Sequence, residues 1–164
     1  MIKMLVTDVD GVLTDGNLHL GPSGEYKVFN VKDGMGANLL KSNGLILAAI
    51  SGRKSVYTEQ RLKEMGFDHI FLGVKDKLSV FKELKSQMIL SFEEIGFTGD
   101  DLNDLDCLNQ SGLSFAPKGA ASQVLNTVDY VTENTGGEGY FREVCEYILS
   151  KEKINFNESF KSGN

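Results

Sequence analysis

Short apolar runs alternate along the chain with longer segments that have helical spacing. Residues 45–50 are apolar at every position, which is typical of a strand buried on both faces of a parallel sheet. Residues 76–88 instead repeat their apolar side chains at helical intervals. The pattern predicts strands over 2–7, 45–50, 69–72, 95–98, 113–116 and 128–132, and helices over 34–42, 56–65, 76–88, 102–110, 120–126 and 140–150. This alternation predicts an α/β Rossmann-like fold with a parallel sheet sandwiched by helices.

One stretch near the N-terminus breaks this alternation. Residues 18–20 and 26–31 flank the turn Gly21-Pro22-Ser23-Gly24, a pattern that predicts a β-hairpin over about 17–31. Ser91 and Glu94 resemble a capping box that opens a short helical turn. The length of 164 residues predicts a single domain over 1–150, followed by a polar tail over 151–164.

Composition narrows the possible partners and compartment. The net charge of −6 argues against a nucleic-acid partner. The sequence has neither a signal peptide nor an apolar run of membrane length, so we expect a cytoplasmic protein without a membrane partner. Its two cysteines, Cys107 and Cys145, lack metal-site spacing and are predicted to be core thiols in a reducing compartment.

Two acidic clusters follow predicted strands. Asp8-Val9-Asp10-Gly11 comes directly after the first strand, and Gly99-Asp100-Asp101-Leu102-Asn103-Asp104 comes after the strand at 95–98. In parallel sheets, ligands bind at the carboxyl ends of the strands beside a topological switch point. We therefore expect both clusters at one site, where carboxylates bind a divalent cation and one of them acts as a nucleophile. The hairpin follows the first cluster and is expected to overhang this site as a flap.

The residues supply every group that phosphoryl transfer needs. We expect Asp8 to attack phosphorus and form an aspartyl-phosphate, and Asp10 to protonate the leaving oxygen and then to activate water. Asp8, Asp100 and the backbone carbonyl of Asp10 are the predicted ligands of Mg²⁺. Ser51 ends an apolar strand, where its hydroxyl can bind phosphate; a simple turn serine is the alternative.

A lysine and two further aspartates complete the predicted site. Lys77 begins a helix, an unfavourable place for a cation, which favours a specific electrostatic role. Lys75 is the competing candidate. Asp101 and Asp104 are expected to tune the metal or orient the lysine without binding the metal directly.

This set of motifs resembles the haloacid dehalogenase-type phosphatases. Closest are the 3-deoxy-D-manno-octulosonate 8-phosphate phosphatases and the related nonulosonate 9-phosphate phosphatases, and the resemblance runs from about residue 2 to residue 149. The motifs that carry it are Asp8-x-Asp10, Thr14-Asp15-Gly16, Val31-Lys32-Asp33-Gly34, Ser51-Gly52-Arg53, Asp76-Lys77-Leu78, Gly99-Asp100-Asp101-x-x-Asp104 and Gly136-Gly137-Glu138-Gly139-Tyr140-Phe141-Arg142-Glu143.

The resemblance implies a Mg²⁺-dependent phosphatase acting on a small 2-keto-3-deoxy sugar acid phosphate. Predicted elements already fill the gaps between the motifs, so no separate cap domain is expected. A site without a cap would be open to water. The family covers it by forming a homotetramer in which a neighbour's C-terminal segment, here 136–139, lies over the site. The resemblance also implies that the substrate is contacted by Thr14, Gly52, Arg53, Gly137 and Glu138.

Some alternatives remain open at this stage. Glu138 stands where octulosonate phosphatases usually have a basic residue, which points to a nonulosonate 9-phosphate, whereas Arg53 favours the octulosonate phosphate. Arg53 is also a candidate to pair with Glu64 on the following helix. A non-catalytic oligomerisation module and a broad-specificity phosphatase are the competing functions; the intact Asp10 favours an enzyme over the module.

Overall fold

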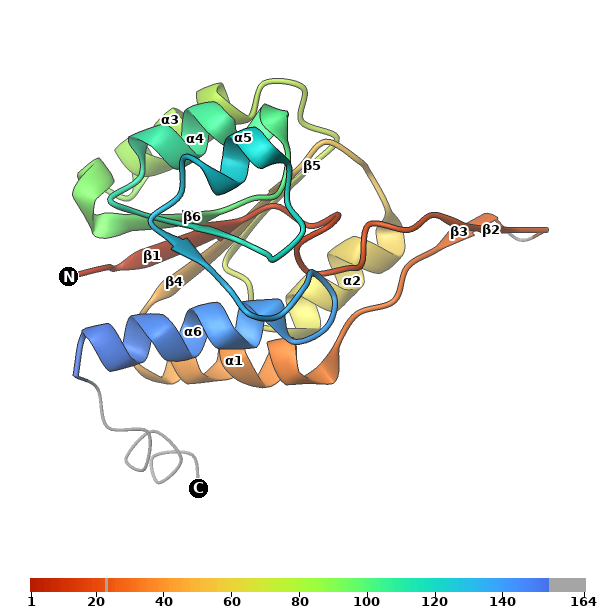
Figure 1. The fold of residues 1–164 in the computed structure, drawn as a ribbon, viewed down its shortest axis with the longest axis horizontal. Helices are drawn as coiled ribbons and strands as arrows, with labels where there is room; N and C mark the ends of the chain where they lie inside the picture. The colour runs from red at the N-terminus through yellow and green to blue at the C-terminus, as the bar shows by residue number, and fades with distance from the viewer. Residues whose placement is uncertain (23, 154–164) are drawn as a thin grey trace.

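The computed structural model describes residues 1–22 and 24–153, and its centre is a six-stranded parallel sheet (Figure 1). The strand order is β5-β4-β1-β6-β7-β8, and each neighbouring pair is parallel. This confirms the predicted fold class. The strands are β1 (Met4–Thr7), β4 (Ile46–Ser51), β5 (His69–Leu72), β6 (Ile95–Thr98), β7 (Leu113–Ala116) and β8 (Tyr130–Val131).

Helices cover both faces of this sheet (Figure 1). One face carries α1 (Val31–Ser42), α2 (Val56–Glu64) and α6 (Tyr140–Lys151), and the other carries α3 (Lys77–Gln87), α4 (Leu105–Gln110) and α5 (Ser122–Leu125). Because side chains alternate along a strand, Leu5 packs into the first core while Met4 and Val6 pack into the second. Both faces of β1 are thus buried, as its continuous apolar run predicts.

The strand order changes direction at β1. The chain passes from β1 to β4 and β5 on one side, and then crosses to β6, β7 and β8 on the other. Thr7 at the end of β1 is paired with Ala49 of β4 and with Thr98 of β6. The loops that follow these three strands therefore meet at one edge of the sheet, which is the switch point where such folds bind ligands.

The hairpin forms, but its second strand lies earlier than predicted. It consists of β2 (His19–Gly21) and β3 (Gly24–Tyr26), which pair only with each other and project from the body (Figure 1). The strand predicted over 26–31 is wrong except at Tyr26, because residues 27–30 lie outside any strand and Val31 already begins α1. The side chain of Asn30 accepts a hydrogen bond from the Lys32 amide and caps this helix, so the local cap overrides the β-propensity of the valines.

Element boundaries differ elsewhere by a few residues. The helix predicted over 102–110 is divided into the 3₁₀ turn η2 (Leu102–Asp104) and α4. The capping box before η1 (Phe92–Glu94) is confirmed, since the Ser91 amide donates to Glu94 Oε2 at 2.9 Å. Both cysteines are buried and free.

The C-terminal end of the described chain is fixed to the N-terminal strand. Helix α6 reaches one residue further than predicted, and the Ile2 amide donates to Glu152 Oε1 at 3.0 Å. Residues 154–164 of the predicted tail lie outside the described residues. Within the described part of the chain, every helix is too short or too polar to cross a membrane.

Candidate active site

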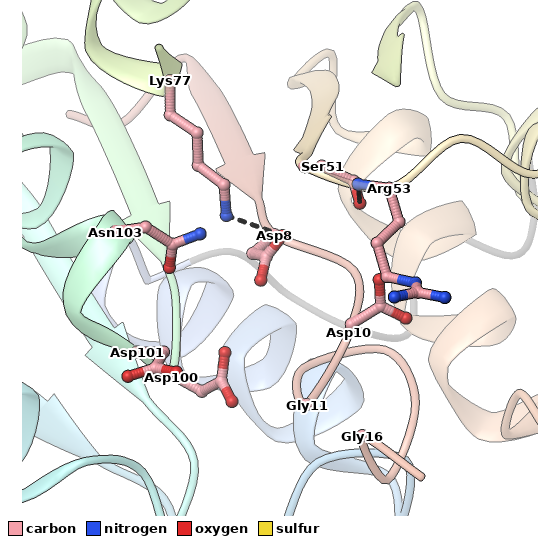
Figure 2. A pocket seen from close by; sticks show the side chains of 11 residues that line it. Asp8, Asp10, Gly11, Gly16, Ser51, Arg53, Lys77, Asp100, Asp101 and Asn103 are labelled. Atoms are coloured by element: carbon pink, nitrogen blue, oxygen red, sulfur yellow. Dashed lines mark hydrogen bonds and ion pairs between the residues drawn. The ribbon is translucent and has the colours of Figure 1, made fainter. Parts of the chain in front are cut away.

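A pocket of about 280 Å³ opens at the carboxyl ends of β1, β4 and β6 (Figure 2). It brings together the predicted catalytic and metal-binding residues from loops that are far apart in the sequence. Its lining consists of Asp8, Asp10, Gly11, Gly16, Ser51, Gly52, Arg53, Lys77, Asp100, Asp101 and Asn103. Asn103 was not among the predicted site residues, although it lies within the second acidic cluster that marked this loop.

A buried cluster of one lysine and two aspartates lies at the wall of the pocket. Lys77 Nζ lies 2.9 Å from Asp8 Oδ1 and 2.7 Å from Asp104 Oδ1. All three side chains are less than a tenth exposed, whereas the competing Lys75 is exposed. Lys77 is the first residue of α3, and Asp76 caps that helix through the Ser79 amide. The helix start therefore directs the lysine to the end of β1 (Figure 2).

Asp104 is held on both of its carboxylate oxygens. Oδ1 binds Lys77, and Oδ2 accepts hydrogen bonds from the backbone amides of Asp100 and Asp101, at 3.1 and 3.4 Å. The Asp101 carboxylate is exposed and accepts from the Leu102 amide, so its side chain organises the turn. Of the two aspartates predicted to orient the lysine, Asp104 is the one that contacts it.

Burial and mutual repulsion disfavour the charged forms of Asp8 and Asp100. Burial, followed by repulsion from Asp104, raises the pKa of Asp8 to about 7, and Lys77 offsets only part of this. Burial, followed by repulsion from Asp8 and Asp104, likewise raises the pKa of Asp100 to about 7. Burial lowers the pKa of Lys77, but attraction from Asp8 and Asp104 outweighs it, so this lysine stays charged.

The donor set fits a hard divalent cation. Oxygen atoms of Asp8, Asp100 and Asp104 lie within 4.8 Å of one another. Lys77 and two backbone amides already bind the carboxylate of Asp104. The carboxylates available for a cation are therefore those of Asp8 and Asp100, and a cation bound there would relieve the repulsion between them. All candidate ligands are oxygens, the type that Mg²⁺ prefers.

The loop after β1 needs glycine at position 11. Gly11 has φ +82°, and a Cβ atom there would lie 2.0 Å from Asp100 Oδ2. Thr14 Oγ1 accepts hydrogen bonds from the amides of Gly11 and Gly16, at 3.4 and 3.3 Å. Thr14 is buried and absent from the pocket lining, so it shapes the loop that presents Asp10.

The turn after β4 supplies a hydroxyl, a glycine and an arginine to the pocket. Ser51 is buried at the end of the strand, and its Oγ accepts a hydrogen bond from the Arg53 amide at 3.2 Å. The alternative pairing of Arg53 with Glu64 does not form. The Arg53 guanidinium pairs with Glu25 of the hairpin, whereas Glu64 pairs with Arg61 three residues before it on α2.

Sequence reasoning missed the lysine that contacts Asp10. Lys27 follows β3, and its Nζ lies 2.6 Å from Asp10 Oδ1. A signal was present: Glu25 and Lys27 are two residues apart in the predicted hairpin, the spacing by which side chains of an extended segment face one surface. The inner end of the hairpin therefore borders the pocket, while its tip projects outward (Figure 1).

The glycine-rich segment packs against the first acidic loop of its own chain. A Cβ on Gly136 would lie 1.9 Å from Gly11 O, and the Gly137 amide donates to Val12 O at 3.1 Å. Glu138 accepts a hydrogen bond from Thr135 and lines a neighbouring hollow of about 370 Å³, which shares Gly11, Gly16 and Asp100 with the pocket. Packing within one chain thus requires these glycines, independently of any neighbouring subunit.

Known proteins share this sequence and this fold. The haloacid dehalogenase-like hydrolase family profile matches residues 74–142. The 3-deoxy-D-manno-octulosonate 8-phosphate phosphatase of Escherichia coli K12 is 38% identical over 149 residues, which cover 90% of this chain and 79% of that enzyme. The corresponding enzyme of Yersinia pestis is 40% identical and is covered to 80% of its length.

Solved structures extend the comparison to three dimensions. A Moraxella catarrhalis 3-deoxy-D-manno-octulosonate 8-phosphate phosphatase, in complex with magnesium ion, phosphate ion and a KDO molecule, superposes with a TM-score of 0.93 at 38% identity, covering 99% of this chain and 94% of that one. The cobalt-bound Haemophilus influenzae enzyme gives 0.90 at 37% identity, covering 97% and 96%. This chain therefore belongs to the 3-deoxy-D-manno-octulosonate 8-phosphate phosphatase family of haloacid dehalogenase-like hydrolases.

Proposed function

We propose that this protein is a Mg²⁺-dependent phosphatase that hydrolyses 3-deoxy-D-manno-octulosonate 8-phosphate. The observation that carries the proposal is the buried contact of Lys77 with Asp8 and Asp104, beside Asp100, at the switch point of the sheet. This arrangement places Asp8 as the nucleophile, the Lys77 ammonium group and the carboxylate ligands for a metal ion in one pocket. It matches the needs of phosphoryl transfer and the family to which the chain belongs.

In this mechanism Asp8 attacks phosphorus in line with the leaving group. The P–O bond to the sugar breaks as the Asp8–phosphorus bond forms, and Asp10 gives its proton to the departing sugar oxygen. Asp10 then takes a proton from water, which attacks the aspartyl-phosphate and regenerates Asp8. When bound by Asp8, Asp100 and the Asp10 carbonyl, Mg²⁺ shields the negative charge of the phosphoryl group.

Other residues of the pocket bind the transferring group and the sugar. The charged Lys77 neutralises phosphoryl oxygens next to Asp8, and Ser51 donates its hydroxyl to one of them. Arg53 is a donor for the carboxylate of the sugar acid, because guanidinium pairs such groups through two hydrogen bonds. Gly52 lets the backbone approach the substrate closely beside Ser51.

A substrate panel tests the assignment. We expect kcat/KM to be highest for 3-deoxy-D-manno-octulosonate 8-phosphate, lower for nonulosonate 9-phosphates and much lower for hexose phosphates, with Mg²⁺ present throughout. A preference for a nonulosonate 9-phosphate would favour the second candidate, which the acidic Glu138 beside the pocket supports. Equal rates across the panel would indicate a broad-specificity phosphatase, and no turnover a non-catalytic oligomerisation module.

We further propose a homotetramer in which the hairpins meet. The hairpin and the start of α1 expose apolar side chains that the body does not cover, namely Leu18, Leu20, Tyr26, Val28, Val31 and Met35. A two-stranded hairpin is marginally stable alone, and burial against other hairpins would stabilise it. Light scattering should give four times the mass of one chain; an active monomer would contradict this arrangement.

A further inference from the structure

The inner end of the hairpin reaches the active-site pocket through two ion pairs. Lys27 Nζ lies 2.6 Å from Asp10 Oδ1 and 3.8 Å from Glu25 Oε1, and Glu25 in turn pairs with Arg53. Within the described residues, β2 and β3 form a sheet only with each other, so these charges link the hairpin to the turns after β1 and β4. A continuous chain of charges thus runs from Asp10 to Arg53 through two hairpin residues.

The burial of Lys27 is unusual for its position. Its side chain is 5% exposed, although Tyr26 beside it is 57% exposed and Val28 is 55% exposed. Lysines on projecting hairpins normally keep their charge in water, since exposed ion pairs contribute little and ordering a long side chain costs entropy. A lysine buried against one carboxylate is therefore fixed in place, and it fixes that carboxylate too.

Asp10 depends on this contact for its orientation. Across the described residues, the pair with Lys27 is the only ion pair that Asp10 makes, and its side chain remains 25% exposed to the pocket. The loop around Gly11 sets the Asp10 backbone, but Lys27 sets where the carboxyl group points. A general acid must lie within hydrogen-bond reach of the atom that it protonates, so this orientation matters for the reaction.

We propose that Lys27 is a positioning residue that holds the Asp10 carboxyl at the leaving-group side of the pocket. This rests on the proposed phosphatase function and adds to it a residue outside the known motifs of the chain. The hairpin then contributes to the reaction, because it carries Lys27, which orients the general acid Asp10. Lys27 acts through Asp10 and needs no contact with substrate.

The proposal makes the effect of Lys27 depend on the leaving group. A sugar alkoxide is a poor leaving group that needs a proton from Asp10, whereas 4-nitrophenolate leaves readily without one. A lysine that only binds the phosphoryl group would affect both substrates alike, because both carry the same phosphate. A lysine that only stabilises the fold would also affect both alike.

The experiment compares Lys27→Met, Lys27→Arg and, as a matched control, Lys54→Met, an exposed lysine that follows Arg53. We expect Lys27→Met to lower kcat/KM, which reports the step in which the leaving group departs, by at least about tenfold for 3-deoxy-D-manno-octulosonate 8-phosphate, a part of the ~10²–10⁴-fold that acid–base catalysis contributes, and by less than about threefold for 4-nitrophenyl phosphate. Lys27→Arg should recover most of the loss, and Lys54→Met should show none. Equal losses on both substrates, or no recovery by arginine, would overturn the proposal.

A double variant tests the role of Lys27 separately from the proposed phosphatase function. In Asp10→Asn, the lysine has no acid left to orient, so adding Lys27→Met should change kcat for 4-nitrophenyl phosphate by less than about twofold. A further loss in the double variant would overturn the positioning role. Failure of the wild-type protein to turn over the octulosonate phosphate, with 4-nitrophenyl phosphate still hydrolysed, would instead contradict the proposed substrate and leave this double-variant test intact.

Discussion

Asp8 and Asp10 are two residues apart in one loop, yet their carboxyl groups lie in different surroundings. Asp8 is 8% exposed and contacts Lys77, which α3 and the main sheet hold in place. Asp10 is 25% exposed and contacts Lys27, which comes from the projecting hairpin. We call Asp8, Lys77 and Asp104 the inner half of the site, and Asp10, Lys27, Glu25 and Arg53 the outer half.

In the proposed mechanism, this difference separates the part of the site that binds the phosphoryl group from the part that contacts the leaving group. The inner half consists of residues fixed by buried strands and helix ends, as suits a step in which the same phosphoryl group reacts every time. The outer half is attached to a hairpin whose position depends on a few ion pairs. Substrate preference can therefore change in the outer half without disturbing the nucleophile.

The largest expected effect separates the two aspartates. Asp8→Asn should abolish turnover, because the amide is not a nucleophile, and should also weaken Mg²⁺ binding. Asp10→Asn should lower kcat by ~10²–10⁴-fold but spare Mg²⁺ binding, because only its backbone carbonyl is expected to touch the metal. Activity assays and magnesium titrations on both purified variants check this; equal losses of magnesium affinity would contradict the division into halves.

The next effect lies within the second acidic loop. Asp104→Asn should lower kcat/KM by about 10–100-fold, because it weakens the hydrogen bond that holds Lys77 in place. In the proposed mechanism Asp104 itself touches neither substrate nor metal. Asp101→Asn is the matched control, because its carboxylate is exposed and caps η2 through the Leu102 and Asp104 amides. Kinetics should show a change below about threefold for the control. If the control loses as much as Asp104→Asn, the loop matters more than the lysine contact.

Arg53→Met should act on substrate choice. A hydrogen-bonded charge pair contributes about 1.5–3 kcal/mol, but Glu25 already occupies this guanidinium, so the net gain from a substrate carboxylate lies at the low end. We expect kcat/KM for the sugar acid phosphate to fall about tenfold. The value for 4-nitrophenyl phosphate, which has no sugar carboxylate, should stay nearly constant. A parallel fall for both substrates would place Arg53 on the phosphate instead.

The smallest expected effect is a pH dependence of stability in the metal-free protein. Folding raises the pKa values of Asp8 and Asp100 from 3.8 to about 7, so between these values the folded state holds more protons than the unfolded state. The free energy of unfolding should therefore decrease as pH rises from about 4 to 7. Asp33, whose pKa burial raises to about 6, adds to the same trend.

Thermal unfolding in chelator and in Mg²⁺ measures this trend. Mg²⁺ should raise Tm more at pH 8 than at pH 5, because the cation relieves a repulsion that protons relieve at low pH. The double variant Asp8→Asn, Asp100→Asn should lose most of the difference between the two conditions. An increase in metal-free stability from pH 5 to pH 8 would contradict the repulsion between these carboxylates.

The inner half was predictable from the sequence because buried strands dictate it. Continuous apolar runs located β1, β4 and β6, and a parallel sheet brings the carboxyl ends of such strands together. Asp8 follows β1 directly, Ser51 ends β4 and Asp100 lies two residues after β6, so their meeting required no knowledge of side-chain contacts. The position of Lys77 at the start of α3 completed the set.

The outer half depends on contacts that the sequence pattern does not specify. Lys27 sits in a projecting hairpin, where most lysines face water, and only the folded chain shows it buried against Asp10. The alternative pairing of Arg53 with Glu64 fails for the same reason, since Glu64 is closer in sequence while Glu25 is close in space. The end of the hairpin was misplaced because the Asn30 cap decided where α1 begins.

The contact between Gly136–Gly137 and the Gly11–Val12 turn has a consequence for protein synthesis. The nucleophile emerges from the ribosome long before Gly136 and Gly137, yet these two residues support the loop that presents it. A nascent chain thus cannot complete this loop until both glycines have left the exit tunnel. A chain that stops before Gly136 would carry Asp8, Ser51, Lys77 and Asp100 yet lack the support that shapes the loop after β1.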